Sequence, residues 1–96
     1  MTVRFASRTL ERCYVSSALA LRRYGQVVGR RYIQRINIIK HVKSPAELIA
    51  LPGLHCHALK GNLSGRHTIL LTGQVRLIVS IRDDFATIEE VSKHYD

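Results

Sequence analysis

The segment of residues 51 to 61 carries two side chains whose chemistry suits work on a phosphate ester. His57 is suited to proton transfer, because the imidazole is the side chain that most often acts as a general acid or base. Lys60 follows three residues later and can hold a phosphate as a compact positive charge. Arg76 can hold a phosphate at two points through its planar guanidinium. Together these residues offer proton transfer beside anion binding.

Cleavage of RNA by its own 2′-hydroxyl needs these groups and requires no metal. A base takes the hydroxyl proton, an acid protonates the leaving 5′ oxygen, and cations stabilise the charge that grows on the phosphate. His94 could be the second proton carrier, and Tyr95 could stack on a base or donate a hydrogen bond. The residues therefore predict a small RNA-cutting enzyme without a metal or another cofactor.

Each candidate also has an ordinary structural explanation. A strand histidine such as His57 is usually a surface or half-buried polar residue, and Arg76 could be a solvated side chain. Lys60 could be part of a turn, while residues 94 and 95 lie where chain ends commonly fray. Only the combination of these residues favours a catalytic site.

The run His55-Cys56-His57 invites a second interpretation, a zinc site. His55 and His57 would project from one face of a strand, with His67 or His94 as further ligands. The same alternation turns Cys56 to the opposite face, and the paired ligands of structural zinc sites are missing. We therefore expect no metal.

Two helices are expected to precede the candidate residues. Ser7 can N-cap the first, which carries apolar residues at spacings of three and four until Gly25 ends it. The second is expected from about residue 26 to residue 42, with most of its basic residues away from the apolar stripe. Together they predict a helical hairpin with one buried and one basic face.

A capping box at Ser44, with proline next, predicts a short helix that Pro52-Gly53 ends. From there the apolar period changes to two, and strands are expected at residues 54–59, 67–72, 75–82 and 86 to about 93. A further short edge strand is expected at residues 3–5. Opposite parity of the apolar residues in the last strand indicates a bulge or twist.

The strand of residues 75–82 fixes the expected orientation of the sheet. Val75, Leu77, Val79 and Ile81 share one face, which should pack on the helices, so that Arg76 lies on the other. The order of elements predicts one α+β domain over residues 1–96. An N-terminal helical hairpin and a short helix pack on one face of a small twisted, mainly antiparallel sheet, and the other face stays open for a substrate.

The charge of +8 is unevenly distributed. Residues 1 to 43 contain ten Arg or Lys and one acid, a net +9, whereas residues 83 to 96 contain five acids and one Lys, a net −4. The basic part favours RNA or the ribosome as partner, although an acidic protein or a plain solvated helix surface would also explain it. No run is apolar enough to span a membrane, so a cytoplasmic protein with two reduced cysteines is expected, a disulfide being the alternative.

Four short segments together resemble HigB-type toxins of the RelE/ParE superfamily. They are LPGLHCHALKG at residues 51–61, Gly65-Arg66, TGQVRL at residues 72–77 and the terminal KHYD. The resemblance implies a RelE-like microbial ribonuclease fold and a type II toxin that cleaves mRNA in the ribosomal A site without a metal. The implied partners are the ribosome, mRNA and a HigA-like helix-turn-helix antitoxin, through which operator DNA would be bound.

The resemblance also implies residue roles. His57 corresponds to the acid or base, Lys60 and Arg76 to groups that stabilise the phosphate and transition state, and His94 to a position where relatives often have Tyr. Three further residues are expected to bind RNA: Arg66, Lys93 and Tyr95. Val75 stands where relatives commonly have Trp, and the familiar order of Tyr then His is reversed at the end, so that His94 or Tyr95 could enter the site. A ParE-like gyrase inhibitor and a catalytically silent RNA- or ribosome-binding relative stay open as alternatives.

Overall fold

The computed structural model describes residues 1–60 and 65–93 of the 96-residue chain. It has the predicted α+β architecture, with four helices and five strands in the described part. In chain order these are β1 (Thr2–Phe5), α1 (Arg8–Val15), α2 (Ser17–Tyr24), α3 (Gln26–His41), α4 (Pro45–Ala50), β2 (His57–Ala58), β3 (Arg66–Leu70), β4 (Arg76–Arg82) and β5 (Phe85–Ser92).

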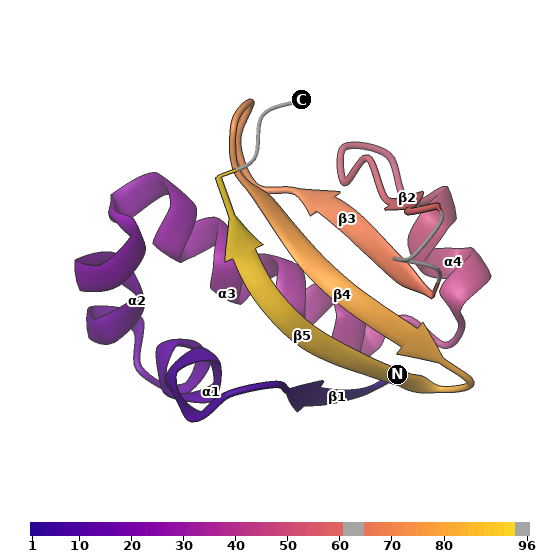
Figure 1. Ribbon diagram of the computed structural model, residues 1–96, viewed down its shortest axis with the longest axis horizontal. Coiled ribbons are helices and arrows are strands. Elements are labelled where there is room, and N and C mark those ends of the chain that lie inside the picture. The colour runs from indigo at the N-terminus through magenta and orange to yellow at the C-terminus, as the bar shows by residue number, and fades with distance from the viewer. Residues whose placement is uncertain (61–64, 94–96) are drawn as a thin grey trace.

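The strands form one sheet in the order β1-β5-β4-β3-β2. β1 pairs with β5 in parallel, and the other three pairs of neighbouring strands are antiparallel, which confirms the prediction of a mainly antiparallel sheet. Figure 1 shows α3 running behind the sheet, with the opposite face of the sheet toward the viewer. The helices therefore leave one face of the sheet uncovered, as the sequence predicts.

The prediction of a single helix over residues 8–24 is wrong, because the helix is interrupted at Ser16. Ser16 adopts an extended conformation, with φ −116° and ψ 110°. The N–H of Ser16 donates to the carbonyl oxygen of Arg12 at the end of α1. The side chain of Ser16 caps the start of α2 by accepting a hydrogen bond from the N–H of Leu19. A serine competes with helical hydrogen bonds through its own side chain, so this residue can end one helix and begin the next. The ends at Ser7 and Gly25 are as predicted.

The expected strand of residues 54–59 is also mostly wrong, since β2 contains only His57 and Ala58. The preceding His55 has φ 49°, a left-handed conformation that interrupts a strand. Leu54 still accepts a hydrogen bond from the N–H of Leu70 at 2.8 Å, so the segment follows β3 without completing a ladder.

The bulge predicted in the last strand is confirmed. On β4, Ile78 pairs with Glu90 while the next residue, Val79, pairs with Ile88. Glu89 is therefore an extra residue in β5, and the apolar residues on either side of it regain the face that packs on the helices. The turn at Asp83-Asp84 also matches the prediction, because β4 ends at Arg82 and β5 begins at Phe85.

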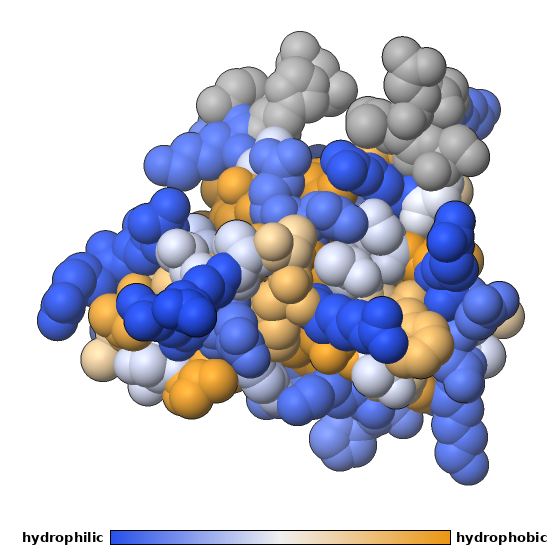
Figure 2. Space-filling model, turned by 60° about the horizontal axis from the view of Figure 1, so that its bottom comes forward, coloured by the Kyte–Doolittle hydropathy of each residue, from blue (hydrophilic) through white to orange (hydrophobic). Residues whose placement is uncertain are grey.

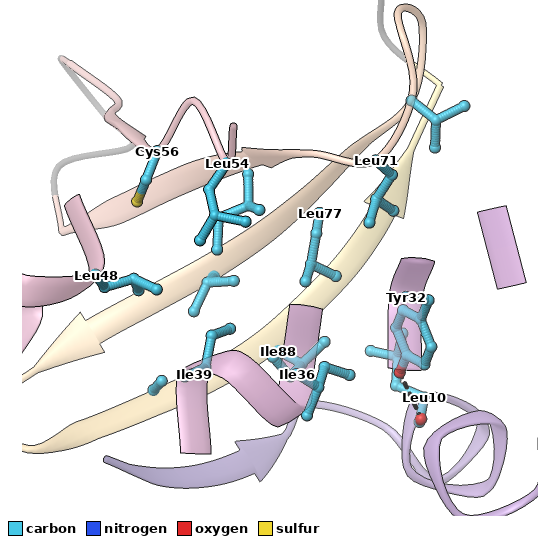
Figure 3. Packing of buried hydrophobic residues seen from close by; sticks show 14 of the residues in the cluster. Leu10, Tyr32, Ile36, Ile39, Leu48, Leu54, Cys56, Leu71, Leu77 and Ile88 are labelled. Carbon is cyan, nitrogen blue, oxygen red and sulfur yellow. Dashed lines mark hydrogen bonds between the residues drawn. The ribbon is translucent and has the colours of Figure 1, made fainter. Parts of the chain in front are cut away.

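The hydrophobic core lies between the inner face of the sheet and the helices (Figure 3). Tyr32 and Ile36 of α3 pack there with Leu77 of β4, and all three are fully buried. The hydroxyl of Tyr32 donates to the carbonyl oxygen of Leu10 at 2.6 Å, which satisfies both buried polar groups. Burial raises the pKa of Tyr32, so it stays a neutral donor.

Both cysteines are free, as predicted, and both are buried. Burial raises the pKa of Cys56, which disfavours the reactive thiolate. In the part of the chain that the structure describes, no helix has both the length and the apolar character needed to cross a bilayer.

Candidate functional site

The uncovered face of the sheet carries three of the predicted site residues. The register pairs His57 with Thr68 of β3, and Thr68 with Ile78 of β4. Arg76 lies two residues before Ile78 and therefore projects from the same face. The predicted orientation of Arg76, opposite the apolar face of β4, is confirmed: Leu77 and Val79 are in the core cluster, whereas Arg76 is half-buried outside it.

The separation of His57 and Arg76 follows from this register. Two strand spacings of about 4.8 Å and one two-residue step of about 6.6 Å place their Cα atoms about 12 Å apart. Thr68 and Ile78 lie between them, and Ile78 is only 9% exposed. The two side chains thus stand on either side of Thr68 and the mostly buried Ile78.

The guanidinium of Arg76 is held by the turn between β3 and β4. Its Nη1 donates to the carbonyl oxygen of Thr72 at 2.9 Å and approaches that of Gly73 at 3.5 Å. The hydroxyl of Thr72 in turn accepts from the N–H of Val75 at 3.2 Å. These bonds use one end of the guanidinium and fix its position, which leaves other N–H groups for a ligand.

Arg66 is the third basic residue on this face, and a carboxylate lies beside it. Its Nη2 is 3.9 Å from Oε1 of Glu89, while Oε2 of Glu89 accepts a hydrogen bond from the hydroxyl of Ser80 at 2.6 Å. The bulge brings Glu89 to the open face. The charge of Arg66 is therefore partly offset, and the residues available to a phosphate concentrate toward His57 and Arg76.

The other predicted site residues lie at the margins of the described structure. Lys60 is exposed two residues beyond the end of β2, next to residues 61–64, which lie outside the described part. Lys93 is exposed immediately after β5, and the pairing of Arg76 with Ser92 places this end of β5 beside Arg76. Figure 1 shows that end next to the β3–β4 turn. His94 and Tyr95 are outside the described residues.

Among the residues that the structure describes, the side chains needed for the zinc interpretation do not come together around residues 55 to 57. His55 precedes β2 in a left-handed conformation, so it does not share a strand face with His57, and Cys56 is buried in the core. His67 projects from the opposite face to His57, since its neighbour Thr68 is the residue on the open face. Its Nδ1 is buried without a hydrogen-bond partner among the described residues, and burial lowers its pKa.

Part of the predicted basic helix face has a structural role instead. Arg31 donates from Nη1 to the carbonyl oxygen of Leu71 at 2.8 Å, and Arg35 donates from Nε to that of Leu70 at 3.1 Å. Burial, and secondarily the charge of Arg31, lowers the pKa of Arg35. These two arginines bind the end of β3 to α3, so they hold in place the turn on which Arg76 rests. Sequence periodicity does not reveal this, because the acceptors are backbone carbonyls.

Hydrophilic side chains project around the periphery of the molecule in Figure 2, with hydrophobic residues between them.

One cation–π contact contributes to the open face at its far end, where the guanidinium of Arg4 lies 4.1 Å from the centre of the Phe85 ring. Arg4 pairs through β1 with Thr87, so it belongs to the edge of the sheet remote from His57. The candidate site therefore occupies the β2–β3–β4 half of the open face.

No protein-family model matches the chain, and no curated protein matches it. Solved structures match along nearly its whole length. A chain of the heterotetrameric YoeB–YefM toxin–antitoxin complex from Staphylococcus aureus has a TM-score of 0.62 and 17% identity, covering 99% of this chain and 98% of that one. A YoeB/ParE toxin from Agrobacterium tumefaciens has a TM-score of 0.57 and 18% identity, covering 99% and 100%.

A copper-bound mutant toxin from Helicobacter pylori is similar as well, with a TM-score of 0.58 and 17% identity over 98% of this chain and 94% of that one. These likenesses define the fold class. The chain has the RelE-like toxin fold, as its sequence resemblance implies. At such low identity the likeness establishes the fold alone, and the function depends on the residues that this chain places on it.

Proposed function

We propose that this protein is the toxin of a type II toxin–antitoxin system and a ribosome-dependent mRNA endoribonuclease that cleaves in the A site. The observation that carries the proposal is the placement of His57, Arg66 and Arg76 on the one uncovered face of a RelE-like fold. The strong positive charge of the chain favours a polyanionic substrate. His57, Arg66 and Arg76 each belong to one of the HigB-like sequence segments.

In the proposed reaction the 2′-oxygen of the ribose forms a bond to phosphorus while the bond from phosphorus to the 5′ oxygen breaks. His57 transfers one of the two protons involved, and His94 or Tyr95 is the candidate for the other. Arg76 and Lys60 stabilise the charge on the phosphate, because the attraction between a cation and the phosphate increases as negative charge develops in the transition state. The protons balance without a metal.

Substrate binding is assigned to the margins of the same face. Arg66, Lys93 and Tyr95 are proposed to contact the RNA. Glu89 limits how strongly Arg66 can do so, since it holds a negative charge 3.9 Å from the guanidinium. This mixed charge suits a substrate that the ribosome delivers and holds, because the protein alone then needs only modest affinity for RNA.

The proposed protein partner is a HigA-like helix-turn-helix antitoxin. One of the similar structures is a toxin–antitoxin complex, which supports an antitoxin partner for this fold. Operator DNA would be bound only through that antitoxin, and the proposed location of the system is the cytoplasm.

Growth arrest after induction of the gene tests the proposal. Wild type should arrest growth, and His57→Ala and Arg76→Ala should relieve the arrest. The matched control is Arg82→Ala, because Arg82 is exposed at the other end of β4 and lies on the same face by strand alternation. Unchanged toxicity in both site variants, with the protein folded by circular dichroism, would remove His57 and Arg76 from the mechanism.

A gyrase-inhibiting toxin is the second candidate, since one similar structure is a YoeB/ParE toxin. That function would leave His57 and Lys60 without a role. Inhibition of DNA supercoiling by the purified protein, without mRNA cleavage, would favour it over the nuclease.

A further inference from the structure

A hollow of about 330 Å³ lies between α1 and α2, the two short helices that meet at Ser16. Each helix contributes side chains at the spacing of three and four residues that places them on a common helix face. The lining residues are Thr9, Arg12 and Cys13 of α1 with Leu19, Arg22 and Arg23 of α2. Three of these side chains are therefore guanidinium groups, and none is a carboxylate.

The hollow has an apolar floor and a cationic rim. On the floor, Cys13 is buried and Leu19 is partly buried. The three arginines around the opening are exposed, as is Thr9, whose hydroxyl group can both donate and accept hydrogen bonds. A ligand in the hollow would therefore meet hydrogen-bond donors on the side chains of both helices.

Two of the rim arginines have no counter-charge in the described part of the chain. Arginines in the last turn of a helix commonly donate to the free carbonyl groups of that turn. Arg12 and Arg22 occupy the last turns of α1 and α2, but neither side chain makes an ion pair or a hydrogen bond within residues 1–60 and 65–93. Their guanidinium groups are therefore free to bind a ligand.

Arg23 is the third cation, and it stands between this hollow and a second one. Its guanidinium carbon lies 6.0 Å from the centre of the Tyr24 ring. The second hollow also contains Glu89 and Glu90 of β5, but Glu89 makes its ion pair with Arg66. Arg23 thus adds positive charge to the first hollow, and no ion pair among the described residues offsets it.

The number of charges and the shape of the guanidinium groups select the ligand. Each guanidinium presents a planar fork that matches two oxygen atoms of a phosphate. A carboxylate carries one charge and fills one fork, and each phosphodiester of RNA also carries one charge, with the next charge farther along the backbone. A terminal phosphate carries about 1.5 to 2 negative charges near neutral pH. Three positive charges around one hollow therefore match a terminal phosphate or a polyphosphate best.

We propose that the hollow between α1 and α2 is a second anion site, which binds the terminal phosphate or polyphosphate group of a free phosphorylated molecule. In Figure 1, α1 and α2 lie on the opposite side of β5 from β4, β3 and β2, and β2 carries His57. The site uses none of the residues assigned to RNA cleavage. Its test therefore does not depend on the proposed nuclease function.

Calorimetric titration of the purified protein with tripolyphosphate, at constant ionic strength, tests the site. Arg12→Gln and Arg22→Gln should each weaken binding at least about fivefold, because each removes charge-assisted hydrogen bonds to the anion. Arg22→Lys should fall between Arg22→Gln and wild type, since lysine keeps the charge without the fork. The matched control is Arg82→Gln, which should bind as wild type does, because Arg82 is exposed at the end of β4 and outside the hollow.

NMR chemical shifts locate the bound anion. Tripolyphosphate should shift the backbone N–H signals of Thr9, Arg12 and Arg22 more than the signals around Arg76. Arg76→Ala should bind tripolyphosphate as tightly as wild type. Thermal melts without ligand check the fold of each variant, and the rim substitutions change only exposed side chains.

Several results would overturn the site. Equal affinity of wild type and both glutamine variants would do so, as would loss of binding in Arg76→Ala, which would place the anion on the open face. Equal affinity of wild type for sulfate would mean that the arginines attract any divalent anion without recognising phosphate. Binding of a short single-stranded RNA that the glutamine variants lose, without binding of tripolyphosphate, would assign the three arginines to RNA.

Discussion

Replacing Gly29 by alanine should destabilise the protein, although alanine is the better helix former. Gly29 is buried in α3 where this helix crosses α2. A Cβ atom there would lie 2.8 Å from the carbonyl oxygen of Ala20, 2.9 Å from its carbonyl carbon and 3.0 Å from the backbone nitrogen of Leu21. All three atoms belong to the backbone of α2, so no side-chain rotation can relieve the contact.

The two opposing contributions decide the sign. Gly→Ala inside a helix stabilises by about 1 kcal/mol through helix propensity. Overpacking of a close contact costs about 1–3 kcal/mol, and the upper part of that range applies because two helices must separate. We expect a net loss of about 1–2 kcal/mol in the free energy of unfolding for Gly29→Ala, which corresponds to a Tm lower by roughly 4–16 °C for a domain of this size.

Urea and thermal denaturation followed by circular dichroism would measure this loss. The matched control is Gly73→Ala, because a Cβ at Gly73 has no heavy atom within 4 Å and its φ is outside the left-handed region. That substitution should stabilise by about 0.4–1 kcal/mol through the unfolded state. If Gly29→Ala is as stable as wild type while Gly73→Ala behaves as expected, the close approach of α2 and α3 is incorrect.

Three further substitutions test the site and the sheet. Arg76→Ala should lower the rate of single-turnover mRNA cleavage on ribosomes by a factor of about 10²–10³. The rate of Arg76→Lys should fall between those of Arg76→Ala and wild type, since lysine keeps the charge without the two-point fork. Equal rates for wild type and both variants would exclude transition-state stabilisation by Arg76. Glu89→Gln should tighten binding of a short RNA about two- to fivefold, because it removes a negative charge from the open face. Fluorescence anisotropy measures the binding, with Glu11→Gln of α1 as the control. Weaker binding would mean that Glu89 positions Arg66. His67→Gln should flatten the pH dependence of stability. Burial lowers the folded pKa of His67 below its unfolded value. Wild type therefore has its full stability above pH about 6.5 and loses part of it as the pH falls through the folded pKa. If the free energy of unfolding changes with pH between 5 and 8 as steeply in His67→Gln as in wild type, this burial is contradicted. The difference in the free energy of unfolding at pH 8 reports the packing cost of the substitution alone.

The fold was largely predictable because its elements carry strong local signals. The alternation of β4 fixed which face holds Arg76, and the capping residues Ser7, Gly25 and Ser44 end or begin helices where they were expected. The break at Ser16 was missed since the apolar spacing of three and four continues across it. A single cap that serves two helices interrupts the backbone without interrupting the pattern.

The site was predictable in part, for a different reason. Strand parity and one resemblance suffice to assign His57 and Arg76 to a common face. The contact of Arg66 with Glu89 was not predictable, because it depends on the bulge that brings Glu89 to that face. The support of the β3–β4 turn by Arg31 and Arg35 was missed as well, since charged helix residues read as solvated unless their acceptors are known.

Mapping of mRNA 5′ ends after induction tests the central claim most directly. Wild type should produce new 5′ ends inside translated reading frames, at a fixed position within codons, and His57→Ala should produce none. His55→Asn is the matched control, because His55 is an exposed histidine two residues away and asparagine tolerates its positive φ. In-frame cleavage lost only in His57→Ala is the predicted result. Growth arrest by wild type without new 5′ ends, or cleavage that persists in His57→Ala, would contradict the assignment of this protein as a nuclease that uses His57.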